Sequence, residues 1–374
     1  MKKIFTLMIL ASGFALGAQA QKDGFYHVQN TLTGRYMVMV DNSQGTTSGA
    51  GNIDMESVET CLDLDEINTH AGSVIYIKGL GGTKYDVQAQ GTSISKLSGN
   101  KLNAQIKAEG DGYVIWGAYS GVTVYLGDAT NLKKGSDTEY KTWSYVKEAG
   151  KNNRYWKLCS IDNKEHFIGI DPDCKDGKGN YWGTMYFGFA FKTYSEGMEV
   201  YYVDGVGDKH FSLKKWTKDV VPATMPVVIK CSSSNPKNNI IKPVTDDEKE
   251  PSDNCLYGRF FDNSNTGHEN RLEYNSKTMR VINVEDGELV FTVADKDYLT
   301  DGKYVPHNKA YLEVKKSAST TLTNGDPSSA IQTVKQETET IDDGIYTLEG
   351  VRMPKGVTPR PGIYIQDGKK FVIK

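Results

Sequence analysis

The sequence predicts an all-β protein. The chain contains 22 Tyr, 12 Phe and 38 Gly residues, a composition that favours strands joined by tight turns. Apolar and aromatic residues alternate with polar ones in short runs, and clusters of Gly, Asn, Asp and Ser separate these runs. No long stretch keeps apolar side chains at the i, i+3, i+4 and i+7 spacing of an amphipathic helix. Any helix should therefore be short.

Residues 1–20 have the pattern of a secretory signal peptide. Lys2 and Lys3 precede an apolar stretch at 4–16, and Ala18-Gln19-Ala20 matches a signal-peptidase site with cleavage after Ala20. The remaining 354 residues carry 42 basic and 47 acidic side chains, a net charge of −5. This weak, interspersed acidity argues against nucleic acid as a partner. No later stretch has the length and apolarity of a transmembrane segment.

Residues 21–180 contain a loose repeat of hairpins, at 24–38, 74–87, 112–126 and 155–170. In each unit an aromatic residue is followed 9 to 11 residues later by another, a spacing that suits two rings on one face of a hairpin. The units begin about 40 to 50 residues apart, and a period near 40 is typical of a β-trefoil. A trefoil has three leaves, so the fourth hairpin either closes the barrel or indicates another barrel or a sandwich.

The first hairpin also carries a family resemblance. Gly24-Phe-Tyr-His-Val-Gln-Asn30 followed by Gly34-Arg-Tyr-Met37 resembles a hairpin of ricin-type and related trefoil modules. The Gln-x-Trp repeats of the sugar-binding ricin branch are absent. The resemblance therefore implies a trefoil-like fold for residues 21–180, and it carries over no carbohydrate specificity.

Residues 181–314 are expected to form an antiparallel β-sandwich. Five segments resemble, in order, the strands of modules common in secreted proteins of anaerobic gut and oral Gram-negative bacteria. These segments are 183–191, 198–203, 221–229, 254–258 and 305–312. Such modules occur in proteins of unrelated function, so the resemblance implies the sandwich and little about activity.

The chain is expected to end in a linker and a small appendage. Residues 315–342 are rich in Ser, Thr, Gln and Glu, as in flexible linkers. Residues 343–374 hold three short apolar-aromatic runs, at 345–348, 363–365 and 371–373, separated by Gly and Pro. The alternative to a separate appendage is a terminal hairpin that packs on the preceding domain.

The tail resembles a shortened form of the C-terminal sorting domain read by the type IX secretion machinery. The matching positions are Gly350, Gly362-Ile-Tyr-Ile365, Lys369-Lys370 and Val372-Ile-Lys374. The resemblance implies a protein of anaerobic gut or oral Gram-negative bacteria that crosses the periplasm. It would then be secreted or displayed on the outer surface, with the export machinery as a partner.

Cysteine and histidine patterns indicate no reactive centre. We consider a disulfide between Cys231, which ends one predicted strand, and Cys255, which begins another; the alternative is buried free thiols. The chain has no Cys-x-x-Cys, His-Glu-x-x-His, Gly-x-Ser-x-Gly or P-loop motif. His27 and His166 alternate with apolar neighbours and are expected on the outer faces of their hairpins. We therefore predict no catalytic residues, no metal and no cofactor.

Two acidic segments are interpreted as solvated surface. The segment 171–180 resembles a calcium loop, but Lys175 and Asp176 occupy the positions where an EF-hand needs a carboxylate and a glycine. A polar turn is therefore favoured. Asp63, Asp65 and Glu66 are expected on the solvated face of a strand.

Aromatic residues in expected loops are the candidate ligand contacts. Tyr181 and Trp182 follow Lys178-Gly-Asn180, and Tyr119 lies in the segment 118–121. Loop aromatics stack on sugar rings or anchor partner proteins. The alternative is that they plug the open end of a barrel.

The sequence thus favours a non-enzymatic binding protein, secreted or at the cell surface, that captures or adheres to a host or dietary polymer. The ligand would be a polysaccharide or a protein. A protease inhibitor is the alternative, with the segment 61–70 or 133–142 as a protruding loop. A structural protein of the cell envelope is a further alternative.

Overall fold

Strands dominate both parts of the molecule. The computed structural model describes residues 21–39, 58–61, 64–93, 105–110, 112–119, 122–127, 154–245, 248–259, 272–306, 308–327, 346–347, 362–366 and 369–373. The chain divides into two compact units, Met1–Ile331 and Gln332–Lys374. Helices named in the described residues are single turns: α1 (Leu64–Ile67), η1 (Ala71–Ser73) and η3 (Pro236–Asn238). The all-β prediction is therefore confirmed.

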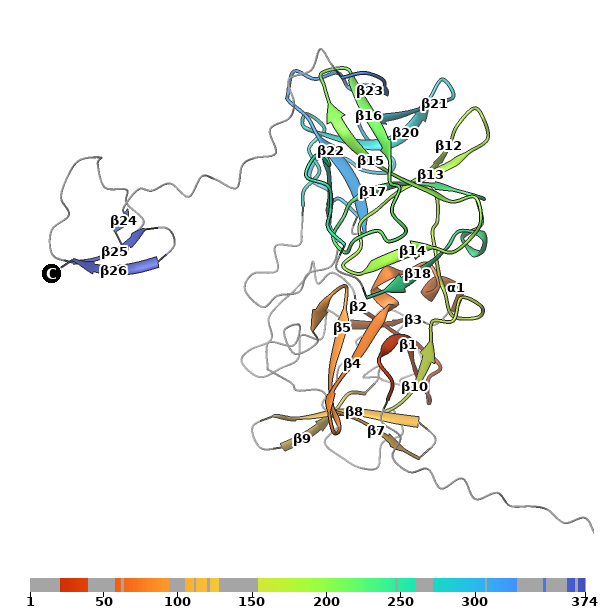
Figure 1. The fold of residues 1–374 in the computed structure, drawn as a ribbon, viewed down its shortest axis with the longest axis vertical. Helices are drawn as coiled ribbons and strands as arrows, with labels where there is room; N and C mark the ends of the chain where they lie inside the picture. Colours follow the sequence, from red (N-terminus) through yellow and green to blue (C-terminus); the bar gives the residue numbers. More distant parts are fainter. Residues whose placement is uncertain are drawn as a thin grey trace, which may run out of the picture. The chain divides into compact units, whose positions relative to one another are not determined.

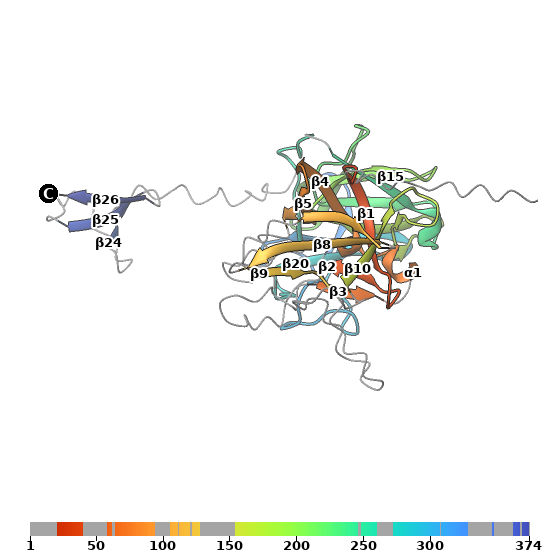
Figure 2. The same ribbon diagram turned by 90° about the horizontal axis from the view of Figure 1, so that it is seen from below.

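Six antiparallel strands close into a ring in the first part of the chain (Figures 1 and 2). In ring order they are β1 (Gly24–Asn30), β4 (Ile75–Gly81), β5 (Lys84–Ala89), β7 (Gln105–Glu109), β8 (Gly112–Tyr119) and β10 (Tyr155–Ser160). Strand β1 closes the ring because it pairs with β4 on one side and with β10 on the other. A closed ring leaves no exposed sheet edge among these six strands.

Short strands leave the ring at three places. Strand β2 (Tyr36–Met39) follows β1 and pairs with β3 (Val58–Cys61), while β6 (Thr92–Ser93) pairs with β5 and β9 (Val122–Tyr125) pairs with β8. The hairpins predicted at 74–87 and 112–126 are present as β4–β5 and β8–β9. The fourth predicted hairpin is wrong. Strand β10 closes the ring, whereas β11 (Ile168–Gly169) joins a different sheet.

Alternating side chains fill the inside of the ring. Tyr26 and Val28 of β1 point inward and pack against Ile77, Val87 and Trp156. Trp156 is fully buried, and its indole N–H donates to the carbonyl oxygen of Leu126 at 3.0 Å. The bulky aromatic is thus buried without leaving its one polar atom unpaired.

Two histidines lie buried on the opposite side of β1. His27 is 0% exposed, and its Nδ1 lies 3.2 Å from Nδ1 of His166, which is 8% exposed. The ring of Tyr36 packs against both. His27 thus lies on the outer face of its strand, as expected, but it is buried there because β2 and the segment after β10 cover this side of β1.

The second part of the first unit contains two sheets. A three-stranded sheet has the order β11, β18 (Ile240–Val244) and β14 (Ala190–Thr193). The larger sheet has the order β12 (Cys174–Lys175), β13 (Tyr181–Met185), β17 (Val227–Cys231), β15 (Glu199–Val206), β16 (His210–Lys215), β23 (Thr321–Asn324), β21 (Glu288–Thr292), β20 (Met279–Glu285), β22 (Lys309–Glu313) and β19 (Leu256–Arg259). The pairing of β16 with β23 is parallel and the other pairings of this sheet are antiparallel.

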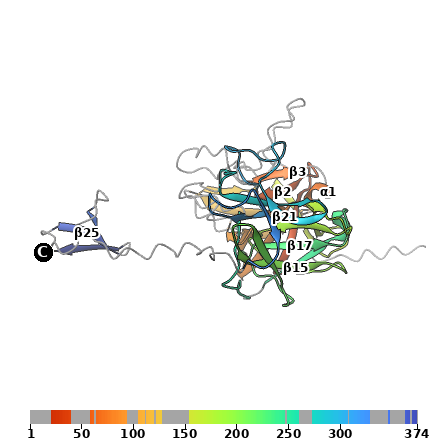
Figure 3. The same ribbon diagram turned by 90° about the horizontal axis from the view of Figure 1, so that it is seen from above.

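Strands β13, β17 and β15 form a layer that is buried on both faces. Figure 3 shows β15 and β17 of this layer as neighbours, in agreement with their pairing. In β17, Val227 and Ile229 pack into the core shared with the three-stranded sheet, whereas Val228 packs into the core that contains Phe211 and Phe291. This explains why residues 227–229 are continuously apolar rather than alternating. Sheets packed face to face are consistent with the predicted β-sandwich.

The ring and the second part pack directly on each other. Ala71, the first residue of η1, and Val74, which follows η1, belong to the same core as Ile229. Farther along the contact, the Gly188 N–H donates to Oε1 of Gln90 at 2.8 Å. A Cβ at Gly188 would lie 2.0 Å from the Gln90 carbonyl oxygen, so only glycine allows this approach. The segment after α1 lies beside the three-stranded sheet, where the Gly169 N–H of β11 donates to the Asn68 carbonyl at 2.7 Å.

The second unit contains three antiparallel strands. They are β24 (Tyr346–Thr347), β25 (Gly362–Gln366) and β26 (Lys369–Ile373), in this order. The prediction of three short strands at 345–348, 363–365 and 371–373 is confirmed. The expected signal peptide at 1–20 and residues 328–342 of the expected linker lie outside the described residues. Within those that are described, no helix has the length and apolar character needed to span a membrane.

The buried histidines make the stability of the fold sensitive to acid. Desolvation, with a smaller effect from His166, lowers the pKa of His27 to about 3, and desolvation also lowers the pKa of His166. Below the ordinary histidine value of about 6.5, the unfolded chain binds protons that the folded chain does not. His27 should therefore make the free energy of unfolding fall between about pH 6.5 and pH 3, by up to about 1.4 kcal/mol per pH unit, and His166 should add to the fall below about pH 6.5.

Replacing His27 by Phe should reduce this pH dependence. Urea denaturation of wild type and His27→Phe at pH 7.5, 5.5 and 4.5 measures the change, and the variant should lose less stability over this range. His210→Gln, at a half-buried histidine of β16, is the control and should follow wild type. Equal losses of stability by His27→Phe and wild type over this pH range would contradict the assignment of the acid sensitivity to His27.

Candidate functional site

A cavity of about 270 Å³ opens where β13, β20 and the start of β22 meet. Its lining combines five polar residues, one tyrosine and an apolar floor. These residues are Asp173, Thr184, Asn283, Asp295 and Lys309, then Tyr298, then Val281, Ile282, Val305, Pro306 and Ala310. We call this cavity the Tyr298 pocket.

The Asp173 carboxylate organises one wall of the Tyr298 pocket. Its Oδ1 accepts a hydrogen bond from Nζ of Lys309 at 2.5 Å, and its Oδ2 accepts one from the Thr184 backbone N–H at 2.8 Å. The Thr184 hydroxyl in turn accepts from the Ala310 N–H at 3.2 Å. The side chains of Asp173 and Lys309 are 22% and 26% exposed, so water screens their attraction incompletely. The loop before β12 is thereby tied to β22.

Tyr298 forms the opposite wall. The residue is 55% exposed, yet desolvation, followed by the negative charge of Asp173, raises the pKa of its hydroxyl to about 12. These two observations are compatible if the hydroxyl end turns into the pocket while part of the ring faces solvent. The Tyr298 N–H donates to the Asp295 carbonyl at 3.0 Å, and Oδ1 of Asp295 accepts from the Asp297 N–H at 2.8 Å. These two hydrogen bonds define a turn at residues 295–298 that holds the Tyr298 backbone in place.

The Tyr298 pocket therefore offers both apolar and polar contacts. Ile282, Val305 and Ala310 are buried and form the apolar floor. The carboxylates accept hydrogen bonds, the Lys309 ammonium donates them, and the Asn283 amide can do both. A ligand with a flat C–H face and hydroxyl groups at its edge matches this combination.

A second cavity of about 240 Å³ adjoins the first at Lys309, which lines both. Its other lining residues are Thr69, His70, Ala71, Gly169, Ile170, Asp171, Met185, Phe187 and Asn308. Asn308 has a φ of +61°, a left-handed conformation that asparagine tolerates better than most residues. Its Nδ2 donates to the Tyr186 carbonyl at 2.9 Å, and the Tyr186 N–H donates to the Asn308 carbonyl at 3.1 Å. These two hydrogen bonds hold Asn308, which precedes Lys309, in place.

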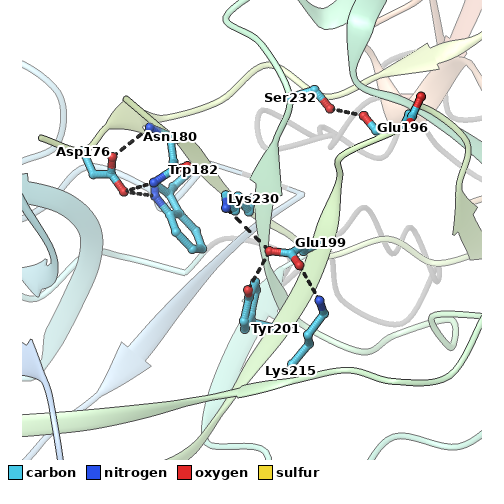
Figure 4. A network of polar contacts seen from close by, with 9 residues as sticks. All are labelled: Asp176, Asn180, Trp182, Glu196, Glu199, Tyr201, Lys215, Lys230 and Ser232. Carbon is cyan, nitrogen blue, oxygen red and sulfur yellow. Dashed lines mark hydrogen bonds and ion pairs between the residues drawn. The ribbon is translucent and has the colours of Figure 1, made fainter. Parts of the chain in front are cut away.

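The predicted ligand residues Tyr181 and Trp182 lie elsewhere (Figure 4). Both belong to β13, so their placement in a loop is wrong. Trp182 is 9% exposed, its N–H donates to Oδ2 of Asp176 at 2.9 Å, and its ring packs 5.7 Å from the Tyr201 ring. Tyr181 is half-buried, with Nζ of Lys175 5.2 Å from its ring centroid. Trp182 therefore makes its contacts within the protein, and little of its side chain is exposed to a ligand.

Within the segment 171–180, residues 176–180 form the predicted polar turn, whereas Cys174–Lys175 form β12. The Asp176 carboxylate accepts hydrogen bonds from the backbone N–H groups of Lys178 and Asn180 and from the Asn180 side chain (Figure 4). Burial opposes ionisation, but the hydrogen bonds from Asn180 and Trp182 outweigh it and lower the pKa of Asp176 to about 2. The described residues contain no cluster of three or more His, Cys, Asp or Glu side chains placed to hold a metal ion.

A network of polar side chains lies on the neighbouring strands β15, β16 and β17 (Figure 4). The Glu199 carboxylate accepts hydrogen bonds from Lys215 and from the Tyr201 hydroxyl, and Nζ of Lys230 lies 3.6 Å away. Lys215, followed by Tyr201, lowers the pKa of Glu199. The cavity of about 440 Å³ beside this network is therefore bordered by charges that already compensate one another.

The structure describes only part of the other segments that the sequence singled out as candidates. Tyr119 ends β8 opposite Val122, and its side chain lies outside the described residues, as does the segment 133–142. Asp65 and Glu66 are exposed, as expected, but they belong to α1 rather than to a strand. The segment 61–70 therefore contains a helical turn, with Ile67 fully buried.

The predicted disulfide between Cys231 and Cys255 does not form among the described residues. Cys231 is a buried free thiol on β17, which pairs with β13 and β15, whereas Cys255 precedes β19, which pairs with β22. The condition for the bridge, pairing of the two strands, is not met.

Burial keeps the thiols of Cys159, Cys174 and Cys231 protonated. It raises the pKa of Cys174 and of Cys231 to about 12 and also raises that of Cys159. Cys159 faces His27 across β1 and β10, but the lowered pKa of His27 keeps the imidazole neutral as well. The environment therefore opposes a thiolate–imidazolium pair.

Comparisons with protein-family models, with curated proteins and with solved structures find no match to this chain. The site must therefore be interpreted from its own chemistry. Tyr298, in the polar segment Asp295-Lys-Asp-Tyr-Leu-Thr-Asp301, satisfies the criterion that selected Tyr181 and Trp182, an aromatic residue among turn-forming residues. The sequence signal was present, but it did not distinguish this loop from the others.

Removing the Asp173 carboxylate should destabilise the protein. Asp173→Ala leaves the Thr184 N–H and the Lys309 ammonium without this acceptor and should cost about 1–3 kcal/mol, measured by urea denaturation. Asp173→Asn keeps a neutral acceptor and should cost less. Asp208→Ala, at an exposed aspartate, is the control and should change the free energy of unfolding by less than about 0.5 kcal/mol. Equal effects of Asp173→Ala and Asp208→Ala would refute this role.

Proposed function

We propose that this protein is a non-enzymatic binding protein that captures carbohydrate in the Tyr298 pocket. The observation that carries the proposal is the tyrosine itself. Tyr298 lines the pocket together with Asp173 and Lys309 and is 55% exposed, so its ring is accessible to a ligand beside the Asp173–Lys309 pair. A sugar ring has an apolar C–H face and a polar hydroxyl edge, so it can use both features at once.

The polar groups give the pocket its preference for hydroxyl groups. Carboxylates accept hydrogen bonds from sugar hydroxyls, and charged partners make these bonds stronger than neutral ones. Asp173 already holds Lys309 and Thr184, so it is pre-organised and need not be ordered when a ligand binds. The proposed ligand contacts are therefore Tyr298, Asp295, Asn283 and Lys309.

We further propose that the ring of six strands is trefoil-like. Closure through β1, β4, β5, β7, β8 and β10 supports this, as do the strands that leave the ring after β1, β5 and β8. The chain is proposed to be exported through the periplasm and to be secreted or held at the outer surface. The signal-peptide pattern at 1–20 and the sorting-type pattern of 343–374 support this location.

Protein capture, protease inhibition and a structural envelope role are the alternatives. An inhibitory loop must be extended enough to enter a protease cleft, whereas the segment 61–70 contains α1 and buries Ile67. This observation favours sugar capture over inhibition through that segment.

Replacing Tyr298 by Ala should weaken sugar binding by about tenfold or more, because the stacking surface is lost. A glycan array selects the sugar, and isothermal titration calorimetry with that sugar measures the dissociation constant. Tyr194→Ala is a matched control, since Tyr194 is 58% exposed and lies outside the Tyr298 pocket. Sugar binding unaffected by Tyr298→Ala, or the absence of any sugar ligand, would refute the proposal.

A further inference from the structure

The Tyr298 pocket and the adjoining second cavity meet at one side chain. Lys309 lines both cavities, and its ammonium is held by Asp173 rather than extended into solvent. The anchored residue Asn308 precedes it. The first cavity is bordered by the larger sheet, whereas Thr69 and His70 of the ring region border the second. The two cavities therefore share Lys309 as a common lining residue.

The sizes of the two cavities suggest one extended site. At about 270 Å³ and 240 Å³, each is smaller than the roughly 300 Å³ at the lower end of small-molecule pockets. Together they fall within that range. A ligand that filled only one of them would leave half of the lining unused.

The charges around the two cavities select a class of ligand. Asp173 is compensated by Lys309, whereas Asp171 in the second cavity and Asp295 in the first are exposed carboxylates. The described lining of both cavities contains no second lysine and no arginine. Carboxylate or sulfate groups on a ligand would thus meet like charges, and hydroxyl groups would meet acceptors.

We propose that the two cavities are consecutive subsites for a neutral oligosaccharide at least two sugar units long, and that acidic chains are rejected. This inference rests on the proposed function. One sugar ring stacks on Tyr298, and the next passes Lys309 into the second cavity. There the Asp171 carboxylate accepts hydrogen bonds from its hydroxyl groups.

Chain length and charge provide the test. Calorimetry is performed with neutral gluco-, manno-, galacto- and xylo-oligosaccharides of one to four units, and with galacturonate oligomers of the same lengths. Affinity for one neutral series should rise about tenfold or more from one unit to two. Galacturonate oligomers should bind about tenfold more weakly than the neutral galacto series.

Variants separate the two subsites. Asp171→Ala and the milder Asp171→Asn should abolish the gain from the second unit and leave binding of the single unit unchanged. Asp208→Ala, another exposed aspartate, should behave as wild type. Tyr298→Ala should weaken binding at every length.

Three outcomes would overturn the inference. If binding depends on Tyr298 but not on chain length, the second subsite is wrong and the proposed function stands. Stronger binding of galacturonate than of neutral chains would overturn the charge argument. If no sugar of either charge binds, both the subsites and the proposed function fail.

Discussion

The Asp173 carboxylate is the interaction on which the Tyr298 pocket depends. It joins the loop before β12 to β13 through Thr184 and to β22 through Lys309. A carboxylate has enough acceptor positions to serve both partners, which no neutral side chain of similar size does as strongly. The negative charge of the same carboxylate also contributes, after desolvation, to the raised pKa of Tyr298 in the loop after β21. One charge thus coordinates three chain segments that are distant in sequence.

This arrangement requires a rigid support, and the two-sided burial of β13, β17 and β15 provides it. Residues of β17 alternate between two cores, so neither face can shift without disturbing close-packed side chains. Residues 71 and 74 enter one of these cores from the ring region. The second cavity is consequently lined from two parts of the chain that share a core, rather than by a loop on its surface.

The sequence predicted the strands because their alternation and turn residues are local signals. Hairpins β4–β5 and β8–β9 followed from aromatic spacing alone. The failures were of another kind. Whether Trp182 is exposed depends on Asp176 and Tyr201, and whether His27 is buried depends on His166, 139 residues away in sequence. The Tyr298 pocket likewise arises from packing between segments more than a hundred residues apart, which a pattern read along the chain does not reveal.

The proposed sugar capture and the proposed export use residues of different units of the chain. Every lining residue of the two cavities lies in the first unit, and the sorting-type pattern lies in the second. The three strands of the second unit are short, with little capacity to bury an apolar core of their own. A short, strand-forming tail suits recognition by another machinery better than ligand binding. Because the two roles use different residues, loss of the tail should change where the protein is found and leave its sugar affinity intact.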